Sequence, residues 1–287
     1  MKCVFVGVFT PRSTNYSQAQ CLENQGCEVI RFPYREVRKE IGKREAEEEL
    51  GKLIALEKPQ FVLFSKCNEI KIHIVKKFKD RTKMLLWYMD PVNKSWNVHL
   101  IAKIWHCHAT ACALWRPYKK AKKYSRNVYF VHEGFDPEVD KPFTVRKKYD
   151  VSFIGNLDKK RRKYQEAINL KLFQNVFREE HAKAVSESYI NLNFVRNNSG
   201  CSDRVYKVLA AKGFLLTEPW PHLEDDFTIG KDLDIFSSEK ELKEKISYYL
   251  SHEDVREKIT VNGWHTVQKF NRNNWAKNIL NIYTTVK

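Results

Sequence analysis

Short apolar runs recur along this chain, and stretches with helical spacing separate them. The first half has apolar runs at 4–9, 28–32, 61–65, 83–88, 110–115 and 128–132, with helical stretches such as 17–25, 44–56 and 70–79 between them. The second half has apolar runs near 149–154, 190–194, 214–217 and 234–236. Strands this short and apolar are typical of a parallel sheet that helices cover on both faces. The sequence therefore predicts an α/β protein.

A proline-bearing segment divides the alternating pattern. Asp136-Pro137 and Lys141-Pro142 are followed by the charged run 145–149. Proline is expected there because the chain leaves a sheet and cannot continue a helix. We therefore predict two Rossmann-like βα domains, 1–145 and 146–287, facing each other across a cleft, with a C-terminal helix near 272–287 that packs back on the first domain. Open α/β sheets bind ligands beyond the carboxyl ends of their strands.

Composition excludes several protein classes. No apolar run reaches the roughly 20 residues that span a bilayer, and Met1–Phe9 is too short for a signal segment, so it is expected to be a buried strand. Seven cysteines without close pairing indicate a reducing, cytoplasmic compartment. His106, Cys107 and His108 suggest a zinc site, but neighbours on a strand point to opposite faces, and we expect no metal there.

The positive charge is concentrated in one segment. The chain has 51 Lys and Arg against 35 Asp and Glu, and residues 66–126 alone hold 15 basic and 3 acidic residues. A local excess of this kind favours a polyanionic partner such as nucleic acid, anionic lipid or an acidic glycan over a uniformly solvated lysine-rich surface. Aromatic and basic residues interleave over 105–126, a mixture that holds single-stranded or flipped bases and also occurs on membrane-binding surfaces.

The segment 204–217 predicts one βαβ step. A helix beginning at Arg204 runs into Gly213, and an apolar strand then ends at the loop opening with Glu218-Pro219. Further on come Phe227, Gly230 and the run 233–236, then a charged helix. In order and spacing, residues 151–280 resemble the C-terminal domain of the spore-maturation-type (CgeB-like) glycosyltransferases. The resemblance implies the two-domain GT-B fold and a metal-independent hexosyl or glycosyl transfer from a nucleotide sugar, with UDP the expected nucleotide.

A sugar-nucleotide pyrophosphate needs cations and unpaired backbone N–H groups. The turn at Gly155-Asn156, the basic run 159–163 and the loop 198–203 before Arg204 meet this need. Arg204 stands out because a cation at a helix start is unfavourable unless an anion binds there. The family has a Glu three residues later, where this chain has Lys207, which indicates a different ribose contact or an added phosphate contact. Tyr206 is expected either to stack on the base or to pack. The predicted donor-binding residues are Gly155, Asn156, Arg161, Arg162, Ser202, Arg204, Tyr206, Lys207, Gly213 and Glu218.

The first domain is expected to hold the acceptor. Asp90 follows the strand 83–88 in a Trp-x-x-Asp run that resembles the family's, and Glu133 follows the last strand. Either carboxylate is a candidate general base, and a loop-bracing role is the alternative for Asp90. Loops after strands and the aromatic-basic run supply the predicted acceptor-binding residues, which are Arg12, Asn15, Tyr16, Lys66, Asn68, Trp115, Arg116, Tyr118, Lys119 and Lys120.

These observations predict a GT-B glycosyltransferase that moves a sugar from a nucleotide sugar to a hydroxyl. The basic first half makes a hydroxymethylated base in DNA, as in phage DNA modification, the first acceptor to consider. Two alternatives stay open: a transferase acting on envelope or spore glycans at an anionic membrane surface, and a catalytically decayed nucleic-acid-binding module. No obligatory metal or other cofactor is expected, and the chain is expected to be a monomer or weak homodimer.

Overall fold

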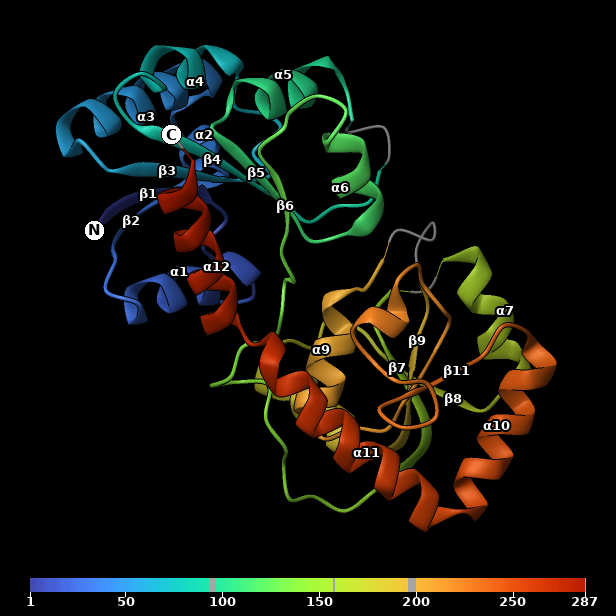
Figure 1. Ribbon diagram of the computed structural model, residues 1–287. Helices are drawn as coiled ribbons and strands as arrows, with labels where there is room; N and C mark the ends of the chain where they lie inside the picture. The colour runs from blue at the N-terminus through green and yellow to red at the C-terminus, as the bar shows by residue number, and fades with distance from the viewer. Residues whose placement is uncertain (93–95, 157, 196–199, 287) are drawn as a thin grey trace. The chain divides into compact units, whose positions relative to one another are not determined.

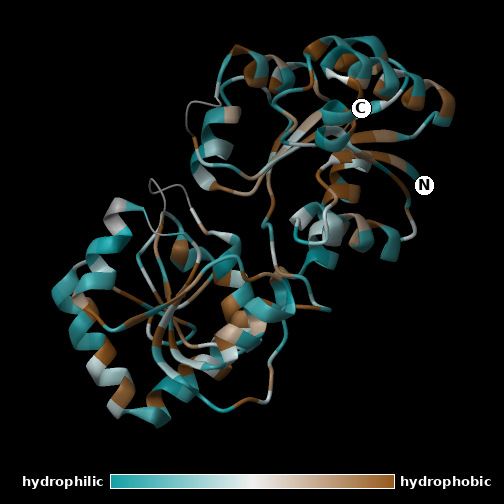
Figure 2. Ribbon diagram, turned by 180° about the vertical axis from the view of Figure 1, so that it is seen from behind, coloured by the Kyte–Doolittle hydropathy of each residue, from teal (hydrophilic) through white to brown (hydrophobic). Residues whose placement is uncertain are grey.

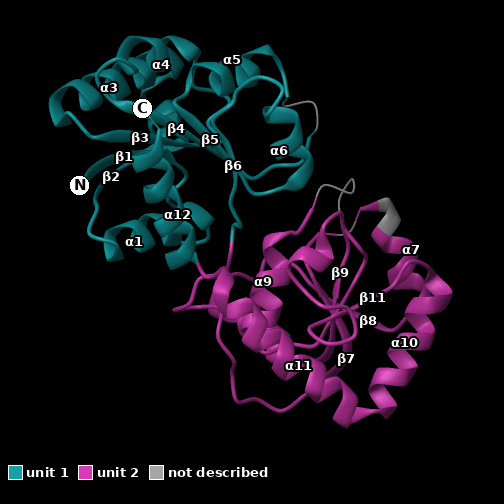
Figure 3. Cartoon of the chain, in the orientation of Figure 1, with its two compact units in different colours: residues 1–133, 272–287 teal, residues 134–271 magenta. Residues whose placement is uncertain are grey.

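The structure is a computed structural model that describes residues 1–92, 96–156, 158–195 and 200–286 (Figure 1). It divides into two compact units (Figure 3). The first comprises residues 1–133 and 272–287, and the second comprises 134–271. The second unit starts earlier than the boundary at 145/146 because Phe135 bridges to Asn271 and the Phe143 N–H donates to Ser186 Oγ (3.1 Å).

The first unit is a six-stranded parallel sheet in the order β2-β1-β3-β4-β5-β6. Alternate residues of each strand enter separate cores, so Val4 and Val6 pack on one face while Cys3 and Phe5 pack on the other. Helices α1 and α12 cover the face of Cys3 and Phe5, and α3, α4 and α5 cover the opposite face (Figure 1). The strands are β1 (Lys2–Gly7), β2 (Glu28–Pro33), β3 (Phe61–Ser65), β4 (Lys83–Tyr88), β5 (Ala109–Cys112) and β6 (Val128–Phe130). The helices are α1 (Thr14–Asn24), α2 (Tyr34–Ile41), α3 (Lys43–Glu57), α4 (Ile72–Phe78), α5 (Val98–His106), α6 (Trp115–Ala121) and α12 (Arg272–Thr285).

The second unit is a five-stranded parallel sheet in the order β11-β10-β9-β7-β8. Helices α8 and α9 pack on one face and α10 on the other. The strands are β7 (Tyr149–Ile154), β8 (Leu170–Phe173), β9 (Ser188–Asn193), β10 (Leu215–Thr217) and β11 (Asp234–Ile235). The helices are α7 (Lys159–Ala167), α8 (Glu179–Ser186), α9 (Asp203–Ala210), α10 (Glu239–Ser251) and α11 (Glu253–Val267), with 3-10 turns η1 (Leu223–Asp225) and η2 (Gln268–Phe270). In both units most of the strands are coloured as hydrophobic, and hydrophilic and hydrophobic residues alternate along the helices (Figure 2).

The alternation predicted from the sequence is confirmed, and so is the α/β fold class. The strands predicted at 61–65, 83–88 and 149–154 are confirmed to the residue. The strand predicted over 110–115 is wrong at its end, because Trp115 already begins a helix. Strand β8 and helices α2, α5 and α6 were not predicted.

The segment around His106 also differs from the expected strand. His106 is the last residue of helix α5, and Cys107 follows as its C-cap. His108 Nδ1 accepts a hydrogen bond from the Met84 N–H (3.0 Å), and burial raises the pKa of the Cys107 thiol to about 12. All seven cysteines are buried thiols. The expectation of no metal at these residues rested on strand geometry, whereas His106 and Cys107 lie at the end of a helix.

Candidate functional site

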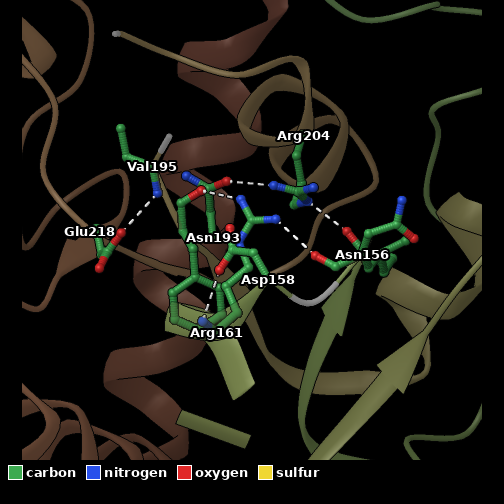
Figure 4. Close-up of polar contacts among 9 residues, drawn as sticks. Asn156, Asp158, Arg161, Asn193, Val195, Arg204 and Glu218 are labelled. Carbon is green, nitrogen blue, oxygen red and sulfur yellow. Dashed lines mark hydrogen bonds and ion pairs between the residues drawn. The ribbon is translucent and has the colours of Figure 1, made fainter. Parts of the chain in front are cut away.

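The carboxyl edge of the second sheet begins with a turn that only glycine fits. Gly155 follows β7 with φ +146°, and a Cβ at this position would lie 2.7 Å from Arg204 Nη2. The next residue, Asn156, has its carbonyl oxygen bound by Arg161 Nη1 (2.8 Å) (Figure 4). Gly155 was predicted to let the backbone approach the donor pyrophosphate; in the structure the group packed against it is the Arg204 guanidinium of helix α9 (Asp203–Ala210).

Arg204 lies in the first turn of helix α9, directly at this edge. Its Nε donates to the carbonyl of Ile154, the last residue of β7 (2.7 Å), and its Nη1 donates to Asn193 Oδ1 (2.9 Å). Its guanidinium also sits over the Phe153 ring, 4.7 Å from the centroid. These contacts fix a positive charge at the start of a helix whose own dipole is positive there. The N-cap residue Ser202 makes no side-chain bond to the helix N–H groups and instead donates to Asn193 Oδ1 (3.1 Å).

Asn193 is the residue that joins three elements at this edge, and sequence reasoning missed it. Its side chain is fully buried at the end of β9. Besides accepting from Ser202 and Arg204, it donates through Nδ2 to Thr217 Oγ1 (2.8 Å) on β10. A polar residue inside an otherwise apolar strand was the available signal, because a buried amide needs partners.

Glu218 braces the adjacent loop. It follows β10, is 8% exposed, and its Oε2 accepts from the Val195 N–H (2.9 Å), as Figure 4 shows. The predicted donor residue Glu218 is therefore at the expected edge, with one oxygen already engaged by the backbone. Asn198 and Ser199, at the start of the loop predicted to bind phosphate, lie outside the described residues.

Three predicted donor-binding residues instead make contacts within the second unit itself. Arg161 is 3% exposed and binds the carbonyls of Asn156 and Phe194, so it clamps two loops inside the protein. The Tyr206 ring is 1% exposed and packs against Phe227 and Phe270, which corrects the stacking alternative in favour of packing.

Gly213 is the third of these residues. It precedes β10, so it lies toward the amino end of the sheet, because α9 runs back from the carboxyl edge. A Cβ at Gly213 would lie 2.4 Å from Val185 Cγ1, so this glycine serves helix packing. The prediction at Lys207 also needs revision, since its Nζ pairs with Asp203 one turn earlier (2.6 Å). Of the basic run 159–163, Arg162 remains exposed on α7.

Burial displaces the pKa values of His181 and Asp226 in the second unit. Burial lowers the pKa of His181, on α8, to about 3, and the cations Lys207 and Arg204 act in the same direction. His181 is therefore neutral at physiological pH. Burial raises the pKa of Asp226 to about 6, partly offset by Lys269.

The carboxyl edge of the first sheet contains a pocket of about 220 Å³. Three predicted residues line it, namely Asn15, Lys66 and Glu133. Lys66 Nζ pairs with Asp90 Oδ1 (2.7 Å), and both side chains are about one-third exposed. The remaining lining residues are Val8, Ser13, Thr14, Tyr34, Arg35, Ser65 and Met89. The two predicted general bases thus lie at one edge, with Glu133 in the pocket wall and Asp90 bound to a pocket lysine.

The backbone of this edge is strained beside the pocket. Lys66 and Cys67 both have left-handed conformations, with φ +59° and +47°. Such conformations cost about 1–3 kcal/mol each and concentrate at functional sites. The buried Lys103 side chain donates through Nζ to the Cys67 carbonyl and holds the loop, and burial lowers the pKa of Lys103. The loop that the sequence singled out is therefore held in an unfavourable conformation by a buried cation.

The other predicted acceptor-binding residues differ in side-chain exposure and in hydrogen bonding. Asn15 is 7% exposed, accepts from the Val8 N–H (3.1 Å), and donates to Gln18 and Ser65, so its primary role is to brace the loop after β1. The Oδ1 atom of Asn68 is buried and has no hydrogen-bond partner among the described residues. Arg12 and Tyr16 are exposed. Sequence reasoning missed Tyr34 and Arg35, although both follow the end of β2 directly, which was the available signal.

The predicted aromatic-basic residues gather on helix α6, where they contact one another. Trp115 and Tyr118 pack against each other and against Phe130 of β6, with ring centroids 5.2–5.9 Å apart. Lys119 lies over the Trp115 ring (5.3 Å) and Lys122 over the Tyr118 ring (4.9 Å). Lys120 lies over Trp96 (4.9 Å), and Arg116 is exposed. The rings are thus already engaged by neighbouring cations and by β6.

Within the described ranges, no group of three or more His, Cys, Asp or Glu side chains is arranged to hold a metal ion. In the same part of the chain, none of the helices combines the length and the apolar character needed to cross a membrane.

Solved structures share this architecture over nearly the whole chain. HepE of Anabaena, solved in complex with UDP, aligns with a TM-score of 0.71 at 8% identity over 100% of both chains. Sucrose-phosphate synthase from Thermosynechococcus elongatus aligns with a TM-score of 0.71 at 10% identity, over 99% of this chain and 98% of that one. T4 phage BGT, in complex with UDP and Mn²⁺, aligns with a TM-score of 0.63 at 11% identity over 99% of both chains. The chain therefore has the GT-B fold, as the sequence predicted.

The sequence itself matches a family over the second unit. Residues 141–281, which include Asn193 and Arg204, match the model of a family described as glycosyl transferase-like. No curated protein matches the chain in sequence.

Proposed function

We propose that this protein is a glycosyltransferase that uses a UDP-sugar. The observation that carries the proposal is the fixed guanidinium of Arg204 at the start of α9, within the glycosyl transferase-like segment. A diphosphate is the anion that suits a cation placed at a helix N-terminus. UDP is favoured because the solved structures of HepE and T4 phage BGT, which share the fold, contain UDP.

Each candidate residue has a role in this proposal. Arg204 and the first-turn N–H groups of α9 bind the diphosphate, Asn193 positions Arg204, and Arg162 supplies a second phosphate contact. In the first unit Glu133 is the general base that takes the proton of the acceptor hydroxyl, because it lines the pocket. The Lys66–Asp90 pair positions the acceptor beside it. Transfer needs no obligatory metal in this scheme.

We also propose a class of acceptor. The basic excess of residues 66–126 supports a polyanionic acceptor, and the first hypothesis is a hydroxymethylated base in DNA. The alternative, a glycan at an anionic membrane surface, matches the spore-maturation-type resemblance. The engagement of the α6 rings by their own lysines weakens the support that this helix gave to nucleic acid.

Thermal unfolding with and without UDP tests the donor. At 100 times its dissociation constant, UDP is expected to stabilise the protein by roughly 2.7 kcal/mol. The variant Arg204→Gln should lose most of this response, whereas Lys240→Gln, at a side chain 87% exposed on α10, should keep it. A panel of nucleotide sugars then identifies the donor. If no nucleotide or nucleotide sugar shifts the unfolding temperature, the transferase proposal is wrong and the decayed-module alternative gains support.

Transfer assays test the acceptor and the metal. Labelled UDP-sugar is incubated with hydroxymethyl-pyrimidine DNA, with unmodified DNA and with glycan acceptors in anionic vesicles, each with and without EDTA. Label on hydroxymethylated DNA alone supports the first hypothesis, and label only on the vesicle acceptor refutes it. Loss of all transfer in EDTA refutes metal independence.

A further inference from the structure

Helix α5 buries its charged residue and exposes part of its apolar surface. Lys103 is the helix's single Lys, Arg, Asp or Glu, and it is 0% exposed, with its Nζ bound to the Cys67 carbonyl. In contrast, Val98 is 71% exposed and Trp105 is 72% exposed. Leu100 and Ile104 face the core, as in any helix that covers a sheet, but such a helix would expose its Lys and would not expose a second set of apolar residues. The outer face of α5 therefore has an apolar composition that the packing of the first unit does not require.

The exposed apolar residues form one stripe. Val98, Ile101, Ala102 and Trp105 are spaced i, i+3, i+4 and i+7, which places them on one side of a helix. Ile101 and Ala102 are partly exposed between the two fully exposed ends. Single exposed apolar residues are common on protein surfaces, but a continuous stripe indicates an interaction surface.

Cations border the stripe at its Trp105 end. Trp105 stacks on His106, with ring centroids 5.6 Å apart. Burial lowers the pKa of His106, and Lys76 of the neighbouring helix α4 and its C-cap Lys79 lower it further, so these lysines lie close to this end of α5. Helices α4 and α5 pack side by side (Figure 1), and Lys76 and Lys77 are exposed.

We propose that the outer face of α5, together with Lys76, Lys77 and Lys79, docks the protein on an anionic phospholipid bilayer. Tryptophan favours the headgroup region, aliphatic side chains enter the acyl boundary, and lysines attract anionic headgroups. Aliphatic residues such as Val98 and Ile101 favour a bilayer over nucleic acid, which offers them no apolar layer. One short helix and a few lysines give reversible, peripheral association.

Vesicle co-sedimentation of the full chain tests this surface, without any donor present. The protein should bind phosphatidylcholine vesicles containing about 30% phosphatidylglycerol and should not bind pure phosphatidylcholine vesicles. Trp105→Ser and the double variant Lys76→Glu/Lys77→Glu should each weaken binding by about five-fold or more. Two matched controls should stay within about two-fold of the wild type. They are Leu56→Ser, at an apolar side chain 77% exposed on α3, and Lys240→Glu on α10.

Further outcomes overturn the proposal. Equal binding by Trp105→Ser and wild type shows that the stripe does not touch lipid. Concentration-dependent self-association that Trp105→Ser abolishes, without vesicle binding, assigns the face to a second copy of the chain. DNA binding lost in the same variant, again without vesicle binding, assigns it to nucleic acid. The response of each variant to UDP is measured separately, so failure of the docking surface is distinguishable from failure of the transferase proposal.

Discussion

Replacement of Asn193 by alanine tests whether the carboxyl edge of the second sheet is built to hold Arg204. The fully buried Asn193 side chain makes three hydrogen bonds, to Thr217 Oγ1 (2.8 Å), from Arg204 Nη1 (2.9 Å) and from Ser202 Oγ (3.1 Å). Alanine removes all three. Thr217 is 0% exposed and has no access to solvent, whereas Ser202 and Arg204 are partly exposed and can turn toward water.

The expected effect has two parts. Thr217 Oγ1 still donates to the Glu218 carbonyl (2.9 Å), so the loss is that of three hydrogen bonds and of side-chain volume. A hydrogen bond contributes about 0.5–1.5 kcal/mol net, and we expect a total destabilisation of roughly 2–4 kcal/mol. That corresponds to a fall in unfolding temperature of roughly 5–10 °C for a domain of this size. In addition, Arg204 loses its hydrogen bond to Asn193 Oδ1. A charge-assisted contact to phosphate contributes about 1.5–3 kcal/mol, so UDP binding should weaken by roughly 10- to 100-fold.

The matched control is Asn191→Ala. Asn191 lies two residues earlier on the same strand and on the same face, and it is 2% exposed. It is hydrogen-bonded to Ser152 Oγ (3.2 Å) and to the Val185 carbonyl (3.4 Å), but it does not contact α9 through these bonds. Calorimetric unfolding and titration with UDP are measured for both variants. Both should lose stability, and Asn193→Ala alone should lose UDP affinity. Equal UDP affinities in the two variants refute the positioning role.

Three other changes have defined outcomes. Burial lowers the folded-state pKa of His181 to about 3, so as pH falls from 6.5 the unfolded chain binds a proton that the folded chain does not, and stability declines. His181→Leu should flatten the stability curve between pH 6.5 and pH 4 in thermal melts, and an unchanged slope contradicts the buried neutral His. Burial raises the pKa of Asp226 to about 6, so Asp226→Asn should stabilise the protein above pH 6 and leave it unchanged near pH 3.8, by the same measurement. Gly155→Ala forces a side chain into φ +146° and against Arg204, so it should cost about 1–3 kcal/mol and reduce the UDP response, and a wild-type response counts against this packing.

The sequence predicted those elements whose local pattern matches their final environment. Strands β3, β4 and β7 are apolar along their length, and buried parallel strands have this pattern. Strand β8 was missed because it is an edge strand with only Leu170 fully buried, so its pattern is weak. Helix α5 was missed because its apolar residues lie on both sides and its lysine is buried, which removes the amphipathic signal.

The sequence predicted the sheet edge at which the candidate site lies, but not the direction in which its side chains point. Residues that follow strands, such as Gly155, Glu218 and Lys66, lie where parallel topology puts them. The direction of a side chain depends on packing between elements distant in sequence, and local patterns do not encode it. Arg161 and Arg162 are neighbours in one basic run, yet one is 3% exposed and clamps two carbonyls while the other is exposed. The same limit explains why the sequence left Tyr206 between base stacking and packing, whereas the structure buries it in the core.

Burial also bears on the two acceptor hypotheses, of which the sequence put hydroxymethylated DNA first. Trp115 and Trp105 both belong to the basic segment, and the sequence treats them alike. A nucleic-acid base needs an accessible ring face on which to stack, but the Trp115 ring packs on Phe130 and lies beneath Lys119. Trp105 is 72% exposed, next to aliphatic residues and near the lysines of α4. The accessible aromatic residue therefore has the neighbours that a lipid surface requires. For this reason the membrane-surface acceptor belongs in the first transfer assays alongside hydroxymethylated DNA, and vesicle binding that Trp105→Ser loses would support it before any acceptor is identified.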